Sequence, residues 1–296
     1  MNCSRNVLIV DQRPVAPCEP PTAWLGGKRH LARRICGVLA ATPHDAYCEP
    51  FIGMGGVFLR RRVRPAVEVI NDLSGDVVTL FRVAQRFPDA LIRELAWRPA
   101  ARAEFERIRG TPDSDLLDIE RAARFLYLQT LGFGGKVAGR SYGVSPTSPH
   151  NFDLTKIEPR LRQLHDRMAG VVIENLDWLA FIGRYDRAGS LFYLDPPYWG
   201  GEGDYGAGMF SRDDFQRMAD RLRTIEGRFL LSINDRPEIR EMFAWADIEA
   251  VKTVYSIQGG NAPGAAELLI AKGVELAPAA PQAKLLYPTA IREHVG

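Results

Sequence analysis

Apolar runs of strand length alternate with amphipathic segments of helix length along much of the chain. The β-prone runs occupy residues 46–51, 66–70, 171–173, 191–194, 229–233, 251–255 and 268–271. Helix-like segments such as 212–225 and 237–243 separate several of them. Short apolar runs bounded by turn residues indicate buried strands, and their alternation with helices predicts a mostly parallel α/β sheet.

The interval 75–165 interrupts this alternation. Its periodicity predicts consecutive helices at 77–85, 90–96, 101–109 and 119–130, followed by a loop rich in Gly, Ser and Pro at 132–149. We therefore expect a main domain built from residues 22–74 and 166–296, a helical insertion at 75–165 and an N-terminal tail at 1–21.

Composition is that of an ordinary globular protein, with 46% hydrophobic and 25% charged residues among 296. No stretch approaches the ~18 apolar residues of a membrane helix, and the N-terminus is proline-rich rather than an apolar signal segment. We expect a cytoplasmic protein without a membrane partner. Cys3, Cys18, Cys36 and Cys48 lack C-x-x-C spacing, so we interpret them as reduced thiols and expect no metal site.

The net charge is only +2, so overall charge does not indicate a partner. Two local clusters are basic, namely Arg29, His30, Arg33 and Arg34, and then Arg60, Arg61, Arg62 and Arg64. Each could bind phosphates or could be a solvated helix end.

The most informative motif is Asp195-Pro196-Pro197-Tyr198, directly after the apolar run 190–194. At the end of a buried strand it places a carboxylate, a rigid turn and an aromatic ring where open α/β sheets bind ligands. Asp195 and the carbonyl of Pro196 could accept the two N–H groups of a planar amine, and Tyr198 could stack on its ring. The alternative is a strand-ending turn with a packed tyrosine.

A second motif, residues 49–58, is a glycine loop between a predicted strand and a predicted helix, with Gly53 and Gly55 as key positions. Glycines let the backbone approach a ligand closely. Asp72 ends the next strand at about the offset that places an acid on a ribose hydroxyl, which indicates a nucleoside-bearing cofactor. The alternative is a glycine packed where a helix crosses a strand.

A third element, Trp24 to Lys28, contains a glycine pair between an indole and an amine. It could close over a cofactor, or it could be a surface turn before a basic helix.

Taken in order, these elements resemble the Dam-type, or D12 class, DNA adenine-N6 methyltransferases. The matching residues are Trp24-x-Gly-Gly-Lys28, Glu49-Pro-Phe-x-Gly-x-Gly-Gly56, Asn71-Asp72, Phe125-Leu-Tyr-Leu128 before Gly132-Phe133, and Asp195-Pro-Pro-Tyr198. The resemblance spans roughly residues 24–272. It implies a seven-stranded, mostly parallel Rossmann-like methyltransferase sheet with a helical target-recognition insertion.

The resemblance also implies S-adenosylmethionine as cofactor and double-stranded DNA as partner, with the target adenine flipped out of the duplex. By position, the cofactor contacts would be Trp24, Lys28, Phe51, Gly53, Gly55, Asp72 and Asp195. Asp195, Pro196, Pro197 and Tyr198 would form the catalytic amine clamp.

The chain departs from the family in the segment that follows Leu131, where Gly134 replaces an Asn and no clear target-reading hairpin follows. Our candidates for DNA contact are Lys136, Arg140, Ser141 and Tyr142; a loop without any DNA role is the alternative. The glycine-rich segment 199–210 could close over bound ligands or could be disordered.

Two other functions remain open at this point. One is methyl transfer to a different amine, such as cytosine N4, an RNA base or a protein amide. The other is a DNA-binding protein that keeps the fold without catalysis. The sequence predicts neither the recognised DNA sequence nor the oligomeric state.

Overall fold

The main element of the structure is a seven-stranded sheet. The computed structural model describes residues 12–135, 137–143, 152–206, 208–252 and 266–276. The strand order is β5-β4-β2-β6-β7-β9-β8. The strands are β2 (Ala46–Glu49), β4 (Val67–Asn71), β5 (Val172–Glu174), β6 (Ser190–Leu194), β7 (Arg228–Asn234), β8 (Asp247–Lys252) and β9 (Ala266–Lys272), and a separate pair joins β1 (Arg13–Pro14) to β3 (Val63–Arg64). The predicted α/β fold class with a mostly parallel sheet is confirmed.

Strand direction fixes where a ligand can bind. β5, β4, β2, β6 and β7 run parallel, and β9 is antiparallel to both of its neighbours. From β2 the chain moves outward to β4 and β5, then returns to the other side of β2 as β6. The strand order therefore reverses between β2 and β6, and ligands of open α/β sheets bind at the carboxyl ends of strands at such a point.

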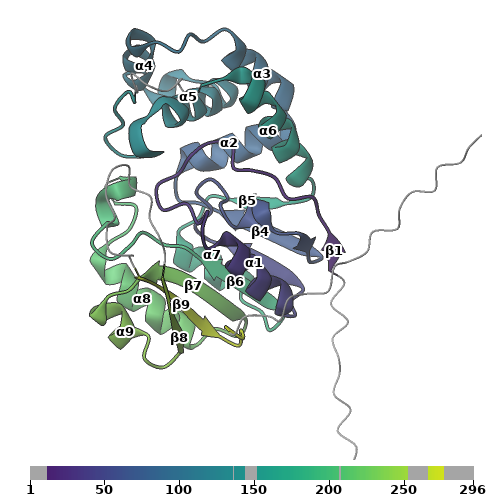
Figure 1. Cartoon of the computed structure of the whole chain (residues 1–296), viewed down its shortest axis with the longest axis vertical. Coiled ribbons are helices and arrows are strands. Elements are labelled where there is room, and N and C mark those ends of the chain that lie inside the picture. The colour runs from purple at the N-terminus through teal and green to yellow at the C-terminus, as the bar shows by residue number, and fades with distance from the viewer. Residues whose placement is uncertain (1–11, 136, 144–151, 207, 253–265, 277–296) are drawn as a thin grey trace, which may run out of the picture.

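Alternate residues of the central strands face two cores. Leu191 and Tyr193 of β6 face a core shared with α1 (Ala32–Ala41) and α2 (Gly75–Arg86). Phe192 and Leu194 face the core formed with α7 (Trp178–Tyr185), α8 (Arg212–Arg223) and α9 (Pro237–Met242). Because successive side chains of a strand point to opposite faces, an uninterrupted apolar strand must be covered on both sides. Figure 1 shows this layered arrangement.

The helices between β4 and β5 form a further layer at one end of the molecule. They are α2, α3 (Pro88–Ala96), α4 (Arg102–Arg109), α5 (Asp118–Leu131) and α6 (Leu154–Arg167). α2 contacts β5 and also packs on α5, so the helical part shares a continuous core with the sheet. In Figure 1, α3, α4 and α5 lie furthest from the strands, and α2 lies between them and the sheet.

Two local expectations need adjustment. The run expected as a strand at 251–255 belongs to β8, which begins earlier at Asp247, and residues 253–255 lie outside the described part of the chain. The glycine loop is followed by a single 3-10 turn, Phe58–Arg60, rather than a longer helix, because the chain already enters the β3 strand at Val63.

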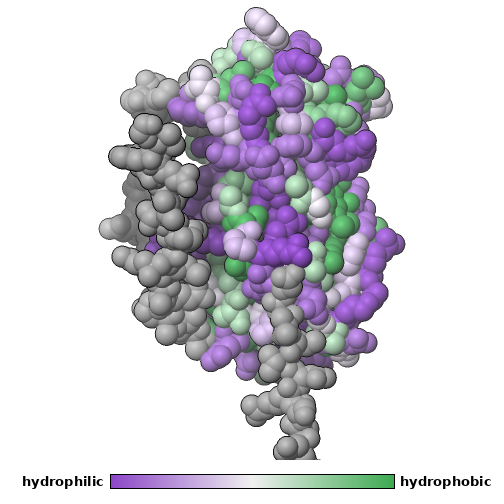
Figure 2. Space-filling view, turned by 90° about the vertical axis from the view of Figure 1, so that its right-hand side faces the viewer, coloured by the Kyte–Doolittle hydropathy of each residue, from purple (hydrophilic) through white to green (hydrophobic). Residues whose placement is uncertain are grey.

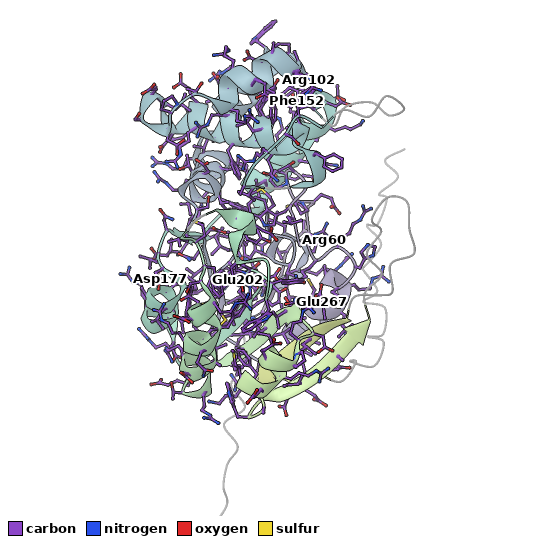
Figure 3. All side chains as sticks on the ribbon, turned by 90° about the vertical axis from the view of Figure 1, so that its left-hand side faces the viewer. Arg60, Arg102, Phe152, Asp177, Glu202 and Glu267 are labelled. Carbon is purple, nitrogen blue, oxygen red and sulfur yellow. The ribbon has the colours of Figure 1, made fainter. Side chains whose placement is uncertain are left out.

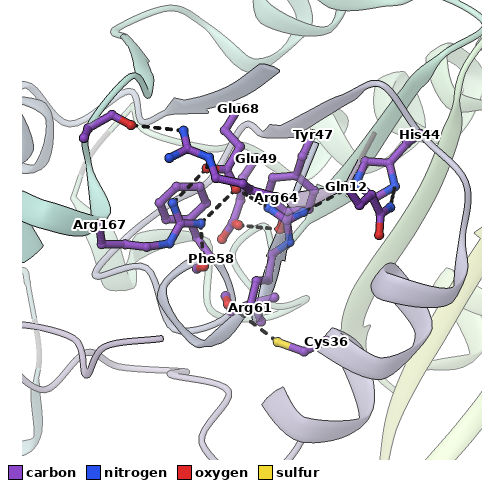
Figure 4. A network of polar contacts seen from close by, with 12 residues as sticks. Gln12, Cys36, His44, Tyr47, Glu49, Phe58, Arg61, Arg64, Glu68 and Arg167 are labelled. Carbon is purple, nitrogen blue, oxygen red and sulfur yellow. Dashed lines mark hydrogen bonds and ion pairs between the residues drawn. The ribbon is translucent and has the colours of Figure 1, made fainter. Parts of the chain in front are cut away.

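The second basic cluster is largely structural. Arg61 donates to Glu68 Oε1 at 2.6 Å, and Arg167 of α6 reaches both carboxylate oxygens of Glu68 at 2.8 Å (Figure 4). Arg64 also lies within 3.3 Å of Glu68. Buried arginines need such partners, because an unpaired charge in the interior is costly. The solvated-helix and phosphate interpretations are therefore both wrong for Arg61.

The described surface is mixed in polarity. On the face drawn in Figure 2, hydrophobic side chains form separate patches between hydrophilic ones. Among the described residues, no helix is both long enough and apolar enough to cross a membrane. Cys18, Cys36 and Cys48 are free thiols, and Cys3 lies outside the described residues.

Candidate active site

A pocket of about 840 Å³ lies at the carboxyl ends of β2, β4, β6 and β7. All three predicted motifs line it, represented by Lys28, Gly53, Asp72, Asp195 and Tyr198. The fold thus brings together segments that are far apart in the sequence, at the edge where the strand order reverses.

The glycine loop is held against the end of β4 by polar contacts. Gly53 N donates to Asp72 Oδ2 at 2.9 Å, and Ser74 N donates to Asp72 Oδ1 at 2.9 Å. The side chain of Asn71 donates to the carbonyl of Pro50 at 2.9 Å. Asp72 therefore fixes the loop, and the two lone pairs on each oxygen leave it able to accept a further hydrogen bond from a ligand.

Burial governs the ionisation of Asp72. Removal from water raises its pKa to about 6, and the backbone N–H groups of Ser74 and Gly53 oppose that rise. A group with this pKa is an anion at neutral pH.

Trp24 packs directly on the glycine loop. A Cβ added to Gly53 would lie 2.5 Å from Trp24 Nε1, and Gly53 has a φ of +48°. The Trp24 ring also lies 5.8 Å from the ring of Tyr205 and 6.3 Å from that of Phe125, measured between centroids. Only glycine allows this approach, because any side chain at position 53 would displace the indole.

The backbone beside Trp24 is tied to the insertion. Leu25 N donates to Gly135 O at 3.1 Å, and the side chain of Gln129 donates to the carbonyls of Ala23 and Gly135 at 3.1 and 2.7 Å. The segment from Trp24 to Lys28 therefore bridges the glycine loop and the end of α5.

The Asp195 to Tyr198 motif follows β6, whose residues are all buried. Lys28 Nζ lies 2.7 Å from Asp195 Oδ1, donates to Tyr198 OH at 2.7 Å and donates to Gly26 O at 3.2 Å. An ammonium has three N–H donors, and these three contacts use them all. A ligand carboxylate could therefore reach Lys28 only by replacing one of these partners.

The carboxyl of Asp195 is held from two sides. Ser232 Oγ donates to Asp195 Oδ1 at 3.1 Å, and Ser232 Oγ lies 2.8 Å from Tyr193 OH. Burial raises the pKa of Asp195 to about 6, while the positive charge of Lys28 and its hydrogen bond lower it. The side chain keeps 21% of its surface exposed, so a ligand in the pocket can reach it.

The tyrosine of the motif is also fixed. Tyr198 OH donates to Glu267 Oε1 of β9 at 2.6 Å, and the Lys28 ammonium lies 4.6 Å from the centre of its ring. The next residue, Trp199, exchanges two hydrogen bonds with the amide of Asn234, at 2.9 and 3.0 Å. The residues after β6 are thus anchored to β7 and β9.

The segment 199–206 is ordered by contacts to other parts of the chain. Tyr205 OH donates to Leu25 O at 3.0 Å, and Ala138 N donates to Asp204 O at 3.3 Å. Both Asp204 and Tyr205 line the pocket. The end of this segment therefore lies at the pocket, in contact with Leu25 and with Ala138.

Two further residues predicted to contact the cofactor, Phe51 and Gly55, pack within or beside the glycine loop. Phe51 lines the pocket and makes an edge contact with Phe210 at 5.9 Å between ring centres. A Cβ on Gly55, which has a φ of +73°, would lie 2.8 Å from Leu59 Cγ.

Two of the residues predicted to contact DNA, Arg140 and Tyr142, make contacts within the protein instead. Arg140 donates to Gln129 Oε1 at 3.1 Å and stacks 4.9 Å from the Phe125 ring centre, and Tyr142 OH donates to Ala100 O at 3.2 Å. Both side chains therefore hold the loop to the helices. Ser141 is exposed, and Lys136 lies outside the described residues.

Several pocket residues were missed by sequence reasoning. They are Tyr193, Asp204, Tyr205, Asn234, Glu267 and the arginines at 160 and 236, together with Ser232 behind Asp195. A signal existed for three of them: Ser232, Asn234 and Glu267 are polar residues within otherwise apolar strands, where burial of a polar group requires a specific partner.

The chemistry of the pocket fits a nucleoside cofactor that carries a reactive group. Trp24 supplies an aromatic surface, Asp72 an acceptor for hydroxyl groups, and Gly53 the backbone against which the Trp24 indole packs, an approach that a Cβ would block. Among the described residues, no group of three or more His, Cys, Asp or Glu side chains could hold a metal ion.

The mostly parallel seven-stranded sheet is that of a Rossmann-like methyltransferase fold. A family described as D12 class N6 adenine-specific DNA methyltransferase matches residues 24–257. The chain belongs to this family, and it is a DNA methyltransferase.

Similar proteins agree with that assignment. The Type II methyltransferase M1.LlaDCHI of Lactococcus lactis subsp. cremoris is 25% identical over 257 residues, which cover 79% of this chain and 87% of that protein. The Type II methyltransferase M.CviBI of Paramecium bursaria Chlorella virus NC1A is 24% identical over 233 residues, covering 76% and 86%. Type II methyltransferase M.MjaIII of Methanocaldococcus jannaschii is 25% identical over 200 residues, covering 61% and 69%.

Proposed function

We propose that this chain transfers a methyl group from S-adenosylmethionine to N6 of an adenine flipped out of double-stranded DNA. The observation that carries the proposal is the position of Asp195. It stands at the end of β6, is fixed by Lys28 and Ser232, and opens into the same pocket as Gly53 and Asp72.

The residues divide the pocket into two parts. Trp24, Gly53 and Asp72, which line the pocket, would hold the nucleoside, and Phe51 and Gly55 would shape the loop. When bound, S-adenosylmethionine supplies a methyl group on a positively charged sulfur.

The second part would hold the target base. Asp195 would accept one N–H of the exocyclic amine and stabilise the positive charge that develops on nitrogen. The carbonyl of Pro196, fixed by the ring of Pro197, would accept the other N–H, and Tyr198 would stack on the base. As the bond from nitrogen to the methyl carbon forms, the bond from that carbon to sulfur would break, and the methylated nitrogen would then lose one proton to solvent.

Exposed arginines at the pocket are suited to the DNA backbone. Arg29, Arg160 and Arg236 line the pocket and are exposed. Phosphate contacts from such side chains position a duplex without reading its sequence. We propose that the segment between β4 and β5 supplies target recognition, with Ser141, which is exposed in the loop after α5, as a candidate contact among the described residues.

The test is methylation of mixed-sequence duplex DNA with labelled S-adenosylmethionine, followed by mapping of the modified positions. We expect N6-methyladenine at one recurring sequence. Asp195→Ala should abolish transfer and retain DNA binding. Methylation only on cytosine N4, or only on RNA or protein, would contradict the substrate, and no transfer by the wild type to any DNA would favour a non-catalytic binding protein.

A further inference from the structure

Two buried hydroxyl groups stand behind the carboxyl of Asp195, on neighbouring strands of the sheet. Tyr193 of β6 is 1% exposed and Ser232 of β7 is 0% exposed. The residues on either side of Ser232, Leu231 and Ile233, are apolar and buried. A buried hydroxyl costs free energy unless it has a hydrogen-bond partner, so the partners of these two groups indicate what they do.

The two hydroxyls form a hydrogen-bond relay with a fixed direction. Ser232 Oγ donates to Asp195 Oδ1 at 3.1 Å and lies 2.8 Å from Tyr193 OH. A hydroxyl has one proton to donate, and an ionised carboxylate can only accept. Since Ser232 donates its proton to Asp195, Tyr193 must donate to Ser232. Bonds in such a series polarise one another, so the bond from Tyr193 strengthens the bond that Ser232 donates.

The contacts of the Asp195 carboxyl are one-sided. Lys28 Nζ lies 2.7 Å from Oδ1, the same oxygen that Ser232 contacts. Within the described part of the chain, the hydrogen bonds and the ion pair of this carboxyl all fall on Oδ1. A carboxylate that is held by one oxygen presents the other to the pocket, where an amine can donate to it.

The backbone after Asp195 is fixed independently of the relay. Asn234 lies two residues beyond Ser232 in β7, so both side chains point to the same face of the sheet. The amide of Asn234 exchanges hydrogen bonds of 2.9 and 3.0 Å with the backbone of Trp199. Loss of the Ser232 hydroxyl should therefore leave the turn after β6 anchored and change the orientation of the Asp195 carboxyl.

The relay also lies apart from the helical part of the molecule. Asn234 pairs in register with Glu267 of β9, and Figure 3 shows Glu267 well away from Arg102 and Phe152 in the helical part. Substitutions in the relay should therefore leave the segment between β4 and β5 in place. An effect on methyl transfer can then be separated from an effect on DNA binding.

We propose that Ser232, supported by Tyr193, is a positioning residue for methyl transfer, which orients the Asp195 carboxylate so that Oδ2 accepts an N–H of the target amine. This inference rests on the proposed function, which places the amine at Asp195. The orientation matters most in the transition state, where positive charge develops on the nitrogen. Loss of the relay should therefore slow the chemical step and leave the binding of both substrates largely unchanged.

The experiment measures single-turnover methyl transfer by the full chain to duplex DNA, together with the dissociation constants for DNA and S-adenosylmethionine. Ser232→Ala should lower the rate roughly ten- to hundredfold, as for loss of a hydrogen bond to a charged group, and change each dissociation constant less than about threefold. Ser232→Thr keeps the hydroxyl in a residue that favours strands, so its rate should stay within about threefold of the wild type.

A double-mutant cycle tests the relay itself. Tyr193→Phe removes only the phenolic hydroxyl and should slow transfer several-fold. In the Ser232→Ala background it should have no further effect, because Tyr193 acts through Ser232. Rates whose losses multiply in the double variant would overturn the assigned role of Tyr193. The double variant leaves neither hydroxyl unpaired, so it gives the rate if Ser232→Ala alone does not fold.

Matched controls lie in the same sheet and in the helix that packs on it. Ser190 of β6 is 1% exposed and donates to Tyr185 O at 2.6 Å, and Tyr185 OH of α7 donates to Glu174 Oε1 at 2.6 Å. Neither Ser190 nor Tyr185 lines the pocket. Ser190→Ala and Tyr185→Phe should therefore transfer methyl groups at the wild-type rate.

The outcomes separate the inference from the function on which it rests. A wild-type rate in Ser232→Ala, equal slowing in Ser190→Ala, or a loss due entirely to weaker binding of DNA or cofactor would overturn the inference. If the wild type methylates adenine in those cases, the proposed function stands. Methylation of cytosine N4 with the expected pattern among the variants would support the inference and overturn the proposed base. Wild type that transfers no methyl group to any DNA would overturn both.

Discussion

Lys28 Nζ lies 2.7 Å from Oδ1 of Asp195, so the segment from Trp24 to Lys28 and the Asp195 to Tyr198 motif meet in one ion pair. Burial alone would raise the pKa of Asp195 further, and the positive charge of Lys28 opposes that rise, which leaves a pKa of about 6. The pair therefore keeps Asp195 ionised at neutral pH inside the pocket.

This pairing predicts the pH dependence of methyl transfer. Asp195 must be a carboxylate to stabilise the developing positive charge, so single-turnover rates should fall about tenfold per pH unit below about pH 6 and level off above it. Lys28→Met removes the charge that lowers the pKa, which should move the fall to higher pH at saturating cofactor.

Lys272→Met is a suitable control, because Lys272 Nζ bonds the carbonyls of Arg223 and Ile225 away from the pocket. Its pH profile should match that of the wild type. A rate that does not change between pH 5 and 8 would contradict the assigned role of Asp195.

Gly53→Ala should weaken cofactor binding by about tenfold or more. The added Cβ would lie 2.5 Å from Trp24 Nε1 in a backbone conformation, φ +48°, that favours glycine. The indole must then move away from the loop. Gly183→Ala is the control: Gly183 is exposed in α7, and a Cβ added there would have no atom within 4 Å, so alanine should stabilise the helix by about 0.5–1 kcal/mol.

Calorimetry with the cofactor and thermal unfolding of both variants measure these effects. If Gly53→Ala bound cofactor as tightly as wild type, the close approach of Trp24 would not matter for the site.

Much of the sheet was predictable because its strands are buried on both faces. The run from Leu191 to Leu194 is apolar without interruption, which is typical of a central parallel strand. The predicted start of β8, residue 251, was four residues too late. The strand, Asp247–Lys252, lies at the edge of the sheet and mixes charged and apolar residues, so it lacks a continuous apolar run.

The site was predictable only where one segment carries several informative residues. The motif at Asp195 and the glycine loop at Gly53 are local patterns. Glu267 and Tyr205 enter the pocket through tertiary contacts with Tyr198 and Leu25, which no local pattern encodes. For the basic run at Arg61, the sequence predicted a phosphate-binding or solvated side chain, and this was wrong. No local pattern shows that Arg61 is buried in an ion pair with Glu68.

Tyr205→Ala should loosen the segment 199–206, whose residues Asp204 and Tyr205 line the pocket. Alanine removes both the hydrogen bond to Leu25 O and the ring beside Trp24, whereas Tyr205→Phe removes the hydrogen bond and keeps the ring. We expect Tyr205→Ala to increase proteolysis within 199–206 and to weaken cofactor binding several-fold, with Tyr205→Phe in between.

Limited proteolysis with and without cofactor measures the first effect and calorimetry the second. Equal cleavage of wild type and Tyr205→Ala would show that the contact does not hold the segment.

Removal of an arginine at the pocket should weaken DNA binding without changing cofactor affinity. For Arg160→Ala or Arg236→Ala, loss of one phosphate contact should weaken binding similarly for all sequences and lower the salt slope by about 1. Arg107→Ala is the control, since Arg107 is exposed on α4 and pairs with Glu104. Fluorescence anisotropy at several salt concentrations gives the slopes; slopes equal to those of wild type and control would exclude these residues from the DNA interface.

Glu49→Gln should change how stability depends on pH. Glu49 is buried beside the Arg61 and Glu68 pair and accepts a hydrogen bond from Tyr47 OH at 2.6 Å (Figure 4). Burial raises its pKa to about 8, and the hydrogen bond from Tyr47 opposes that rise. Because the folded pKa lies above the unfolded value, the stability that Glu49 contributes is fully present below about pH 4.5 and is lost as pH rises through about 8.

The free energy of unfolding of Glu49→Gln, measured by urea denaturation, should therefore rise relative to wild type between pH 5 and pH 8. The relative gain should be on the order of 3 kcal/mol, since one pKa unit corresponds to about 1.4 kcal/mol. Tyr47→Phe removes the hydrogen bond that favours the ionised form of Glu49, so in that variant the loss of stability should extend to higher pH. A difference between Glu49→Gln and wild type that stays constant from pH 5 to 8 would mean that Glu49 is ionised throughout this range, with Arg61 and Arg167 outweighing the effect of burial.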